Sequence, residues 1–446
     1  MKLELLKILK EKLKKNSTLF LMPGHKRRGL DELNLLLDTT ESYENDNLND
    51  PKGVIKRSET RASNIFKSKR TFYTVNGSTG GIISSIFYAT KPNDTILIAR
   101  NCHISVLRAA IINRLKVEYI KTNYIAGIDY NIDFEEFKKE LIRFKPKAVV
   151  ITHPNYFGYP TDILKIVALC NSLNILLIVD EAHGAHFNFS KKLPISAVEA
   201  GADIVIESTH KMLTGLTQTA LVHVASDIVD IDNLFDAIKL FQTTSPSYIL
   251  TASNEMAVSF AASVGREKLD ENIAYACELN ESLKSIDKVH VLDNNFKNNR
   301  FTRDPLKIVV GVDGLSGDAL MDRLYYDYNI ECEMNDGKNI LLLATLNNKK
   351  EDYDRVLDAI KEISNSNINN YEENYIKYNP YIPKKAMEPY EAYEKEGIIL
   401  DKKDALNQIS KEFIAPYPPG IPIYAPGEII DDDKFLSEKT ICVKSL

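Results

Sequence analysis

Two stretches, ILLIVDEAH at residues 175–183 and DIVIESTHK at residues 203–211, decide the fold of this chain. Each is built on a short apolar run, Ile175–Asp180 and Asp203–Glu207, and each ends on ionisable side chains. Runs with almost no polar position predict strands that are buried on both faces, as in a parallel sheet. The intervening segment is long enough for a helical crossover, so the two stretches predict one strand–helix–strand unit.

The same pattern recurs along the first half of the chain, where short apolar strands alternate with helical stretches. Such alternation predicts an α/β fold, with a large domain whose mostly parallel mixed sheet is flanked by helices. Further strands are expected at Thr95–Ala99, Ala148–Thr152 and Ala220–Val224, and helices at Phe134–Phe144 and Ile163–Ser172.

A smaller C-terminal α/β domain is expected after residue 300. Its strands are predicted at Lys307–Val312 and Asn339–Leu343, and its helices at Ser316–Tyr326, with Ser316 as N-cap, and Glu351–Ser364. The tail from Asn369 is rich in Tyr and Pro, and its prolines predict that no regular helix forms there. The expected organisation is an N-terminal helix and arm (1–60), a large domain (61–300) and a small domain with the Tyr/Pro-rich segment (301–446).

The composition excludes several classes of protein. The 446 residues correspond to about three domain equivalents at about 150 residues each. With 44% hydrophobic and 26% charged residues, the chain is neither disordered, collagen-like nor a disulfide scaffold. A net charge of -6 argues against broad nucleic-acid binding. Scattered thiols predict a reduced, cytoplasmic protein, and they are Cys102, Cys170, Cys277, Cys332 and Cys442.

Membrane association is not expected either, because no apolar run approaches the ~20 residues of a membrane span. The first 15 residues alternate Leu and Ile with Lys and Glu, which predicts an amphipathic packing helix and neither a secretory signal nor a membrane anchor.

Polar side chains follow four of the predicted strands, at the edge where α/β sheets bind ligands. Any one of these histidines alone is readily explained as a structural residue, but four such ends in succession predict a binding site. The segments are Arg100-Asn-Cys-His103, His153-Pro-Asn155, Asp180-Glu-Ala-His183 and Ser208-Thr-His-Lys211.

The run Asn76-Gly-Ser-Thr-Gly-Gly81 opens a helical stretch. Glycines and hydroxyls at a helix start form either an anion cup for a phosphate or a plain N-cap and turn. Both interpretations stay open on this motif alone. No G-x-x-x-x-G-K-[ST] loop occurs anywhere in the chain, so a Walker A nucleotide site is excluded.

The letters Asp180-Glu-Ala-His183 match a helicase box, but that interpretation fails without a phosphate-binding loop. His183 and His186 have the spacing of a metal pair, yet no third ligand follows, and we expect no metal. A carboxylate at the end of a buried strand needs a cationic partner, and a protonated pyridine nitrogen is one.

Lys211, just beyond the next strand, is a candidate Schiff-base nucleophile. Asp180 and Lys211 are 31 residues apart, one strand–helix–strand unit, which places both at the same sheet edge. A lysine, a carboxylate and a phosphate cup together fit pyridoxal 5′-phosphate, and His103 supplies an imidazole plane to cover its ring.

With these residues in view, the chain resembles the Orn/Lys/Arg decarboxylases, which have the aminotransferase-like fold of type I pyridoxal-phosphate enzymes. It looks like a short form without the N-terminal wing domain of the larger bacterial arginine and lysine decarboxylases. The matching segments are Met22-Pro-Gly-His-Lys26, Phe72–Gly81, Arg100–Ser105, Thr152–Gly158, Val179–His186, Glu207–Lys211, Gln242–Tyr248, Pro416–Pro422 and Pro426-Gly-Glu428.

The resemblance implies a role for each matching residue. Lys211 would be the Schiff-base lysine, Asp180 the partner of the pyridine nitrogen and His103 the stacked imidazole. Thr244 and Ser245 would reach the cofactor of a neighbouring subunit, which implies a homodimer or a higher homo-oligomer. The remaining cofactor contacts would come from Ser78, Thr79, Gly80, His183, Ser208 and His210.

The implied activity is decarboxylation of a basic amino acid, arginine first and lysine or ornithine next, to the amine and carbon dioxide. Lys211 or His210 would then protonate the α-carbon as general acid. Candidates for substrate binding are His25, Glu41, Asp46, Asp50 and Glu428, although a solvated carboxylate is the more common state of such acids.

Two alternatives remain. One is another reaction of this cofactor class, such as aminotransfer or β-elimination. The other is a non-catalytic relative that acts as a scaffold or regulator, against which the intact Lys211, Asp180 and His103 argue.

Overall fold

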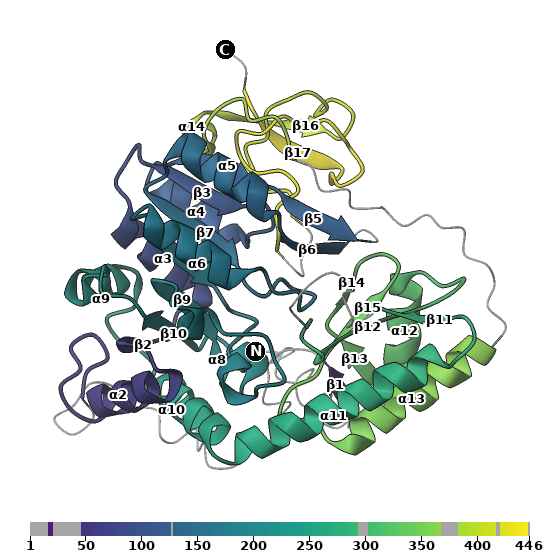
Figure 1. The fold of residues 1–446 in the computed structure, drawn as a ribbon. Coiled ribbons are helices and arrows are strands. Elements are labelled where there is room, and N and C mark those ends of the chain that lie inside the picture. Colours follow the sequence, from purple (N-terminus) through teal and green to yellow (C-terminus); the bar gives the residue numbers. More distant parts are fainter. Residues whose placement is uncertain are drawn as a thin grey trace, which may run out of the picture.

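The computed structural model describes residues 17–20, 46–125, 128–292, 302–366, 382–415 and 420–444. The large domain is built on a seven-stranded sheet, of which Figure 1 labels β3, β7, β9, β10 and β2. All five strands predicted for this domain are present, and only β10 runs antiparallel to its neighbours, so the mostly parallel mixed sheet is confirmed. The order is β2 (Arg70–Thr74), β10 (Ala220–Val224), β9 (Ile204–Ser208), β8 (Leu176–Asp180), β7 (Ala148–Thr152), β3 (Thr95–Ala99) and β4 (Lys116–Ile120).

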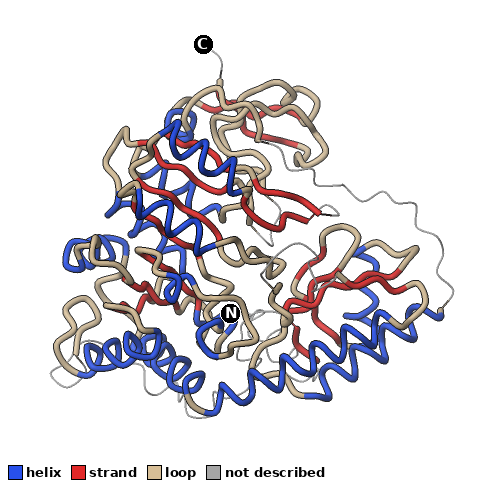
Figure 2. Tube along the Cα trace, viewed as in Figure 1, coloured by secondary structure: helices blue, strands red, loops and turns tan. Residues whose placement is uncertain are grey.

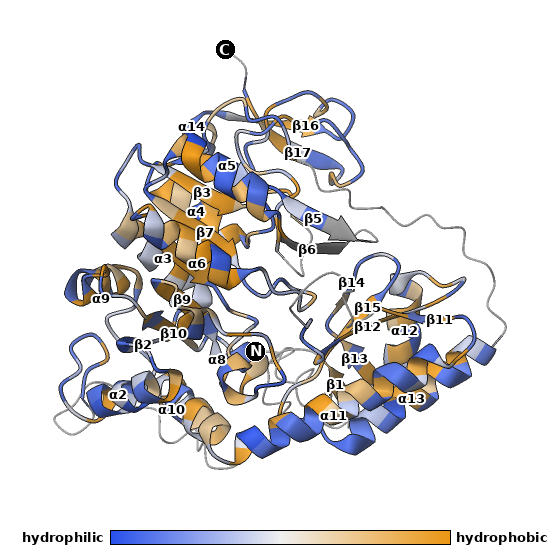
Figure 3. Ribbon diagram, in the orientation of Figure 1, coloured by the Kyte–Doolittle hydropathy of each residue, from blue (hydrophilic) through white to orange (hydrophobic). Residues whose placement is uncertain are grey.

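Successive side chains of these strands enter two separate cores. In β3, Ile96 and Ile98 belong to one apolar cluster, whereas Leu97 and Ala99 belong to the other. This alternation follows from the two-residue period of a strand. Because both faces are covered, the central strands are apolar throughout, as the orange colouring of β3 and β7 shows (Figure 3).

Helices cover both faces of the sheet (Figures 1 and 2). Three contribute to the cluster that contains Ile96: α3 (Gly77–Ala89), α4 (Ile104–Ile112) and α9 (Ile231–Phe241). Three others contribute to the cluster that contains Leu97: α5 (Phe134–Phe144), α6 (Ile163–Ser172) and α7 (Ala197–Ala200).

A second, smaller sheet is drawn in green at the right of Figure 1. It is antiparallel, in the order β11 (Val289–Val291), β12 (Lys307–Val312), β15 (Ile340–Leu343) and β14 (Met334–Asn335). Its helices are α12 (Gly317–Tyr328) and α13 (Lys350–Asn365), close to their predicted bounds. Ser316 is the N-cap of α12, as predicted, and accepts a hydrogen bond from Ala319 N.

The remaining elements connect these two parts. One apolar cluster joins residues of α2, α10 and α11 to residues of β12. The other elements of these parts are β1 (Thr18–Phe20), α2 (Val54–Phe66), β5 (Thr122–Ile125), β6 (Ile128–Ile132), η2 (Phe187–Phe189), α8 (Thr209–Met212), α10 (Tyr248–Ala262), α11 (Val264–Lys284) and β13 (Ile330–Cys332). Among the helices that the structure describes, none is both long enough and apolar enough to cross a bilayer. A cytoplasmic location stays a prediction.

The C-terminal segment lies against the large domain, at the top of Figure 1. Its elements are α14 (Pro389–Glu394), β16 (Gly397–Asp401) and β17 (Lys439–Val443), and α14 contacts α4. The prediction that prolines exclude a helix here is wrong for α14. Pro389 is the first residue of that helix, where no backbone N–H is needed and the fixed φ of proline suits the helix. The domain bounds expected at residues 60 and 300 stay predictions, and the predicted helix at residues 1–15 lies outside the described residues.

A tight contact fastens the small sheet to the loop after β7. Asp304 N donates to the Gly158 carbonyl at 2.9 Å, and Arg303 Nε donates to the Phe157 carbonyl at 2.8 Å. Gly158 has φ +86, and a Cβ there would come within 2.8 Å of Lys307 Cγ. This position therefore needs glycine for its backbone angle and also for the closeness of Lys307.

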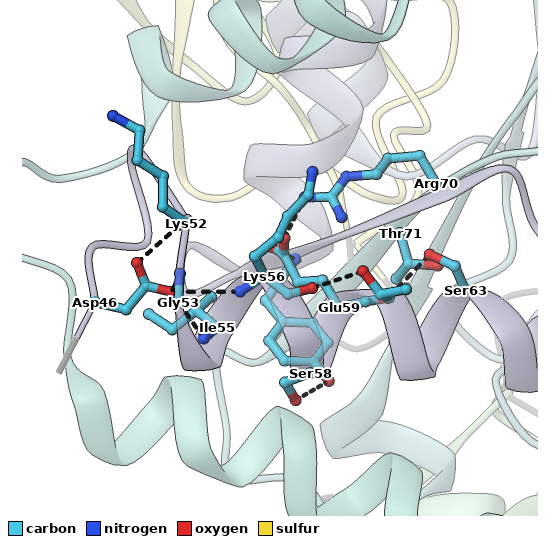
Figure 4. A network of polar contacts seen from close by, with 12 residues as sticks. Asp46, Lys52, Gly53, Ile55, Lys56, Ser58, Glu59, Ser63, Arg70 and Thr71 are labelled. Carbon is cyan, nitrogen blue, oxygen red and sulfur yellow. Dashed lines mark hydrogen bonds and ion pairs between the residues drawn. The ribbon is translucent and has the colours of Figure 1, made fainter. Parts of the chain in front are cut away.

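A buried ion pair fastens α2 to the edge strand β2 (Figure 4). Arg70 pairs with Glu59 Oε2, and Tyr73 N donates to Glu59 Oε1 at 3.1 Å. Burial raises the pKa of Glu59 to about 7, although the neighbouring Arg70 acts to lower it. The carboxylate is thus tolerated inside the protein because a guanidinium accompanies it.

Removing this guanidinium should destabilise the protein most at alkaline pH. Arg70→Met leaves Glu59 buried without its cation, and we expect a loss of about 3–5 kcal/mol in the free energy of unfolding. Glu59 titrates near its ordinary 4.5 when unfolded and near 7 when folded, so stability falls as pH rises through that window. The lost Arg70 raises the folded pKa further and extends the fall above pH 7. Urea unfolding at pH 5.5 and pH 8 measures this.

The control is Arg61→Met, which removes an exposed pair with Glu255. It should cost less than about 1 kcal/mol, because exposed pairs contribute little. Equal losses for the two variants, or a loss for Arg70→Met that does not grow with pH, would contradict the assignment.

Comparing two glycines with the same φ separates the steric effect of Lys307 on Gly158 from the effect of the backbone angle. Gly201 also has φ +86, but a Cβ there meets only Val167 Cγ1, at 3.9 Å. Gly158→Ala should therefore lose about 1–3 kcal/mol more stability than Gly201→Ala, because it adds a steric clash to the same backbone strain. Thermal unfolding of both variants measures the difference, and matching losses would mean that the contact with Lys307 is loose.

Candidate active site

The four predicted strand ends lie along one edge of the sheet, because β3, β7, β8 and β9 are parallel neighbours in space. Three of them meet around one amine. A positive charge on Lys211 lowers the pKa values of Asp180, His103 and His183, so all three side chains are near this amine. His153 is different, because its Nε2 bonds the Ile195 carbonyl at 2.9 Å in the interior, so it is a structural histidine.

Lys211 lies in α8, the single helical turn that begins directly after β9. Its Nζ lies 3.1 Å from His183 Nε2. Burial lowers the pKa of this amine, and the carboxylates of Asp180 and Glu333 offset part of that effect. A half-buried lysine with a lowered pKa has a larger neutral, nucleophilic fraction at physiological pH than an exposed one.

Asp180 is the last residue of β8 and is buried. Its Oδ1 accepts a hydrogen bond from Ala182 N at 3.1 Å. Burial raises the pKa of this carboxyl, whereas Lys211 and the Ala182 amide act to lower it. The strand end therefore presents a carboxylate that a cationic ligand would stabilise.

His103 is fixed as the N-cap of α4. Its Nδ1 accepts from Ser105 N at 3.2 Å and lies 2.8 Å from Ser105 Oγ. Burial and then the positive charges of Lys211 and Arg108 lower the pKa of the ring to about 4. The imidazole is therefore neutral and held in one orientation, which suits a flat surface against a ligand ring.

The predicted anion cup lies in the first turn of α3, which contains Ser78, Thr79 and Gly80. The N-cap residue Asn76 makes no side-chain cap and instead donates from Nδ2 to the Phe241 carbonyl at 3.0 Å. Ser208 Oγ, at the end of β9, is buried without a hydrogen-bond partner among the described residues. An uncapped helix start and an orphaned hydroxyl favour the phosphate interpretation over a plain turn.

The hydrogen bonding of His210 does not suit it to donate a proton. Its Nδ1 lies 2.9 Å from the Thr219 carbonyl, so that nitrogen carries the proton and Nε2 is an acceptor. Burial lowers the pKa of the ring to about 4. Near neutral pH this ring can therefore accept a hydrogen bond at Nε2, but it has no second proton to give.

Three residues that the sequence did not single out complete the site. Lys307 Nζ lies 2.7 Å from His183 Nδ1, and the Tyr156 ring lies 4.5 Å from the His183 ring. Glu333 accepts a hydrogen bond from Tyr156 OH. Tyr156 stands inside a matching segment, so it could have been found, whereas Lys307 and Glu333 come from the small sheet and carry no motif.

The other candidates have different surroundings. Glu428 is buried and accepts from Ala425 N at 2.8 Å and from Arg100, and its role in substrate binding stays a prediction. Asp46 caps the start of α2 through Gly53 N at 2.7 Å, and Asp50 is exposed beside Lys52. Thr244 and Ser245 are exposed in the single chain, and their contact with a neighbouring subunit stays a prediction. His25 and Glu41 lie outside the described residues.

His183 and His186 do not form a metal pair here. His186 Nε2 bonds Asp304 Oδ2 at 3.0 Å, whereas His183 lies between two lysines. Within the described ranges, no group of three or more His, Cys, Asp or Glu side chains is placed to hold a metal ion.

The comparisons with known proteins agree with this geometry. The family described as Orn/Lys/Arg decarboxylase, major domain, matches residues 4–352, and its C-terminal domain matches residues 370–438. The chain is 32% identical to arginine decarboxylase from Bacillus subtilis (strain 168), over 95% of this chain and 90% of that protein.

Solved structures share the fold. Lysine decarboxylase A from Pseudomonas aeruginosa superposes with a TM-score of 0.77 at 20% identity, over 91% of this chain and 74% of that one. Alanine–glyoxylate aminotransferase from Nostoc sp. gives a TM-score of 0.56 at 18% identity, over 69% and 86%. The expected aminotransferase-like fold is confirmed, and the chain belongs to the Orn/Lys/Arg decarboxylase family.

Proposed function

We propose that this protein is a pyridoxal 5′-phosphate-dependent decarboxylase of basic amino acids, with arginine as its preferred substrate. Family membership supports the reaction class, and the relatives named arginine decarboxylase support the substrate. The observation that carries the proposal is the half-buried Lys211 amine, whose pKa is lowered, beside the Asp180 carboxylate, at the edge where the uncapped start of α3 and Ser208 also lie.

The residues present fit this cofactor. Burial disfavours the charged form of Asp180, and a protonated ring nitrogen beside it would stabilise that form. The orphaned hydroxyl of Ser208 and the N-terminus of α3, with Ser78 and Thr79, would hold the phosphate. His103 offers its fixed neutral ring to one face of the cofactor.

When bound, pyridoxal phosphate supplies an electron sink for the bond that breaks at the α-carbon. The chain's own residues position the reactants and move protons. Lys211 would offer its neutral amine to the cofactor aldehyde, and Asp180 would hold the ring nitrogen in its charged form. Because neutral His210 has no proton to give at Nε2, Lys211, once its amine has taken up a proton, would be the group that returns one to the α-carbon.

Recognition of the distal cation is assigned to Glu333. Besides Asp180, it is the acidic residue whose charge acts on the Lys211 amine. It lies between β13 and β14 and receives a hydrogen bond from Tyr156, which orients its carboxylate. A guanidinium is well matched by an oriented carboxylate, since it presents several donors in one plane. We also infer a homodimer, in which the exposed Thr244 and Ser245 reach the partner's cofactor.

An activity panel tests the reaction. Purified protein with pyridoxal phosphate should release carbon dioxide and agmatine from arginine, with lower kcat/KM for lysine and ornithine. Borohydride reduction followed by peptide mapping should place the cofactor label on Lys211. Lys211→Ala should lower turnover by at least about a thousandfold, because it removes the nucleophile and proton carrier together. Keto-acid formation without carbon dioxide, or label on another lysine, would contradict the proposal.

A second variant tests the substrate site. Glu333→Gln keeps the size of the side chain and removes its charge, so the KM for arginine should rise about tenfold or more. Asp50→Asn is the matched control, because Asp50 is exposed beside Lys52 and should leave KM unchanged. Steady-state kinetics over an arginine series measures both, and equal KM values for Glu333→Gln and the parent protein would refute the assignment.

A further inference from the structure

We propose that Lys307 is a positioning residue that acts through His183 to hold Lys211 as a neutral amine. The proposal rests on the role given to Lys211 above, and it concerns the state of this chain's own side chains before any ligand arrives. It follows from the position of the His183 imidazole between two lysines, because a neutral imidazole has only one N–H and one lone pair.

His183 is within hydrogen-bonding distance of a lysine on each side. Its Nδ1 lies 2.7 Å from Lys307 Nζ, and its Nε2 lies 3.1 Å from Lys211 Nζ. A neutral imidazole has one lone pair and one N–H. It can therefore accept from one lysine only, and its N–H must meet a lone pair on the other, which only a neutral amine possesses.

The geometry decides which lysine is neutral. Hydrogen bonds from a charged donor are the shorter ones, and the 2.7 Å contact is that of Lys307. Lys307 also has a carboxylate close by, since it helps to hold the pKa of Asp304 below its usual value against the effect of burial. Lys307 thus donates to Nδ1, and the Nε2–H of His183 donates to Lys211 Nζ.

The imidazole itself stays neutral in this arrangement. Burial lowers the pKa of His183 well below its usual range, and the positive charge of Lys307 acts in the same direction. The other titratable groups that face this ring are Lys211, His210 and His103, and a positive charge on any of them would lower its pKa further. Two carboxylates, those of Asp180 and Glu333, face the Lys211 amine. They act to raise its pKa, whereas burial lowers it. The donor from His183 stabilises the neutral amine against these two negative charges.

Lys307 is held firmly enough for this task. It is fully buried as the first residue of β12, and its carbonyl accepts from Arg303. Its stem lies against Gly158, and its Nζ lies 5.6 Å from the centre of the Tyr156 ring. Because Tyr156 also contacts the His183 ring, one aromatic side chain borders both members of the relay.

The test measures the amine directly, in the full chain freed of cofactor. Trinitrobenzenesulfonate reacts with neutral amines, and peptide mapping gives the rate at Lys211 as a function of pH. Lys307→Met keeps the stem but removes the donor, so Lys211 should regain its proton. Its labelling midpoint should rise by at least about one pH unit, which is about a tenfold slower reaction at pH 8.

A double-mutant cycle separates the relay from a direct charge effect. If Lys307 acts through His183, then Lys307→Met should cause little further shift in a His183→Gln background. Lys385→Met is the matched control, because Lys385 also joins distant segments, through the Val117 carbonyl and the Glu118 carboxylate. An unchanged midpoint in folded Lys307→Met, or the same shift with and without His183, would overturn the proposal.

A measurement on the unmodified chain keeps the proposal testable if a variant does not fold. In protein labelled with ¹⁵N-histidine, His183 should show a protonated Nε2 and an unprotonated Nδ1 at neutral pH. The opposite tautomer, or a doubly protonated ring, would refute it. Neither readout depends on turnover, so an inactive protein with the predicted tautomer would count against the proposed function and not against the relay.

Discussion

The placement of a half-buried lysine amine beside a buried carboxylate is the constraint on which the rest of this structure depends. Charges removed from water cost several kcal/mol each unless they are paired. Burial raises the pKa of Asp180 and lowers that of Lys211, while their attraction opposes both changes. A cationic ligand group beside Asp180 resolves this balance, because it stabilises the carboxylate and leaves the amine free to react.

The large sheet makes that placement possible. Asp180 pairs with Ile206 in the register between β8 and β9, and α8 begins immediately after β9 ends. A slip of one residue would turn Asp180 to the other face of the sheet. Apolar cores on both sides of the strands fix this register, so the packing of the interior determines the geometry of the chemistry.

These relations explain how much the sequence could predict. The central strands β3, β7 and β10 were predicted at their observed bounds, because they are apolar on both faces. The missed strands β2 and β4 are the two edges of the sheet, and polar residues such as Arg70 and Glu118 interrupt their pattern. Lys307 and Glu333 were missed for another reason. They reach the site from a second sheet, and periodicity carries no information on such long-range contacts.

The second sheet also gives the proposed relay a structural consequence. His183 and Lys211 belong to the large domain, whereas Lys307 begins β12 and is seated against Gly158. If that contact opens, Nδ1 of His183 loses its donor, and the imidazole can take the other tautomer and accept from a protonated Lys211. The reactive state of the amine then requires the two sheets to be docked. Glu333 follows β13 and comes from the same part of the chain as Lys307. Docking of the two sheets would therefore bring two groups into place together: the carboxylate proposed to bind the substrate and the lysine that donates to His183.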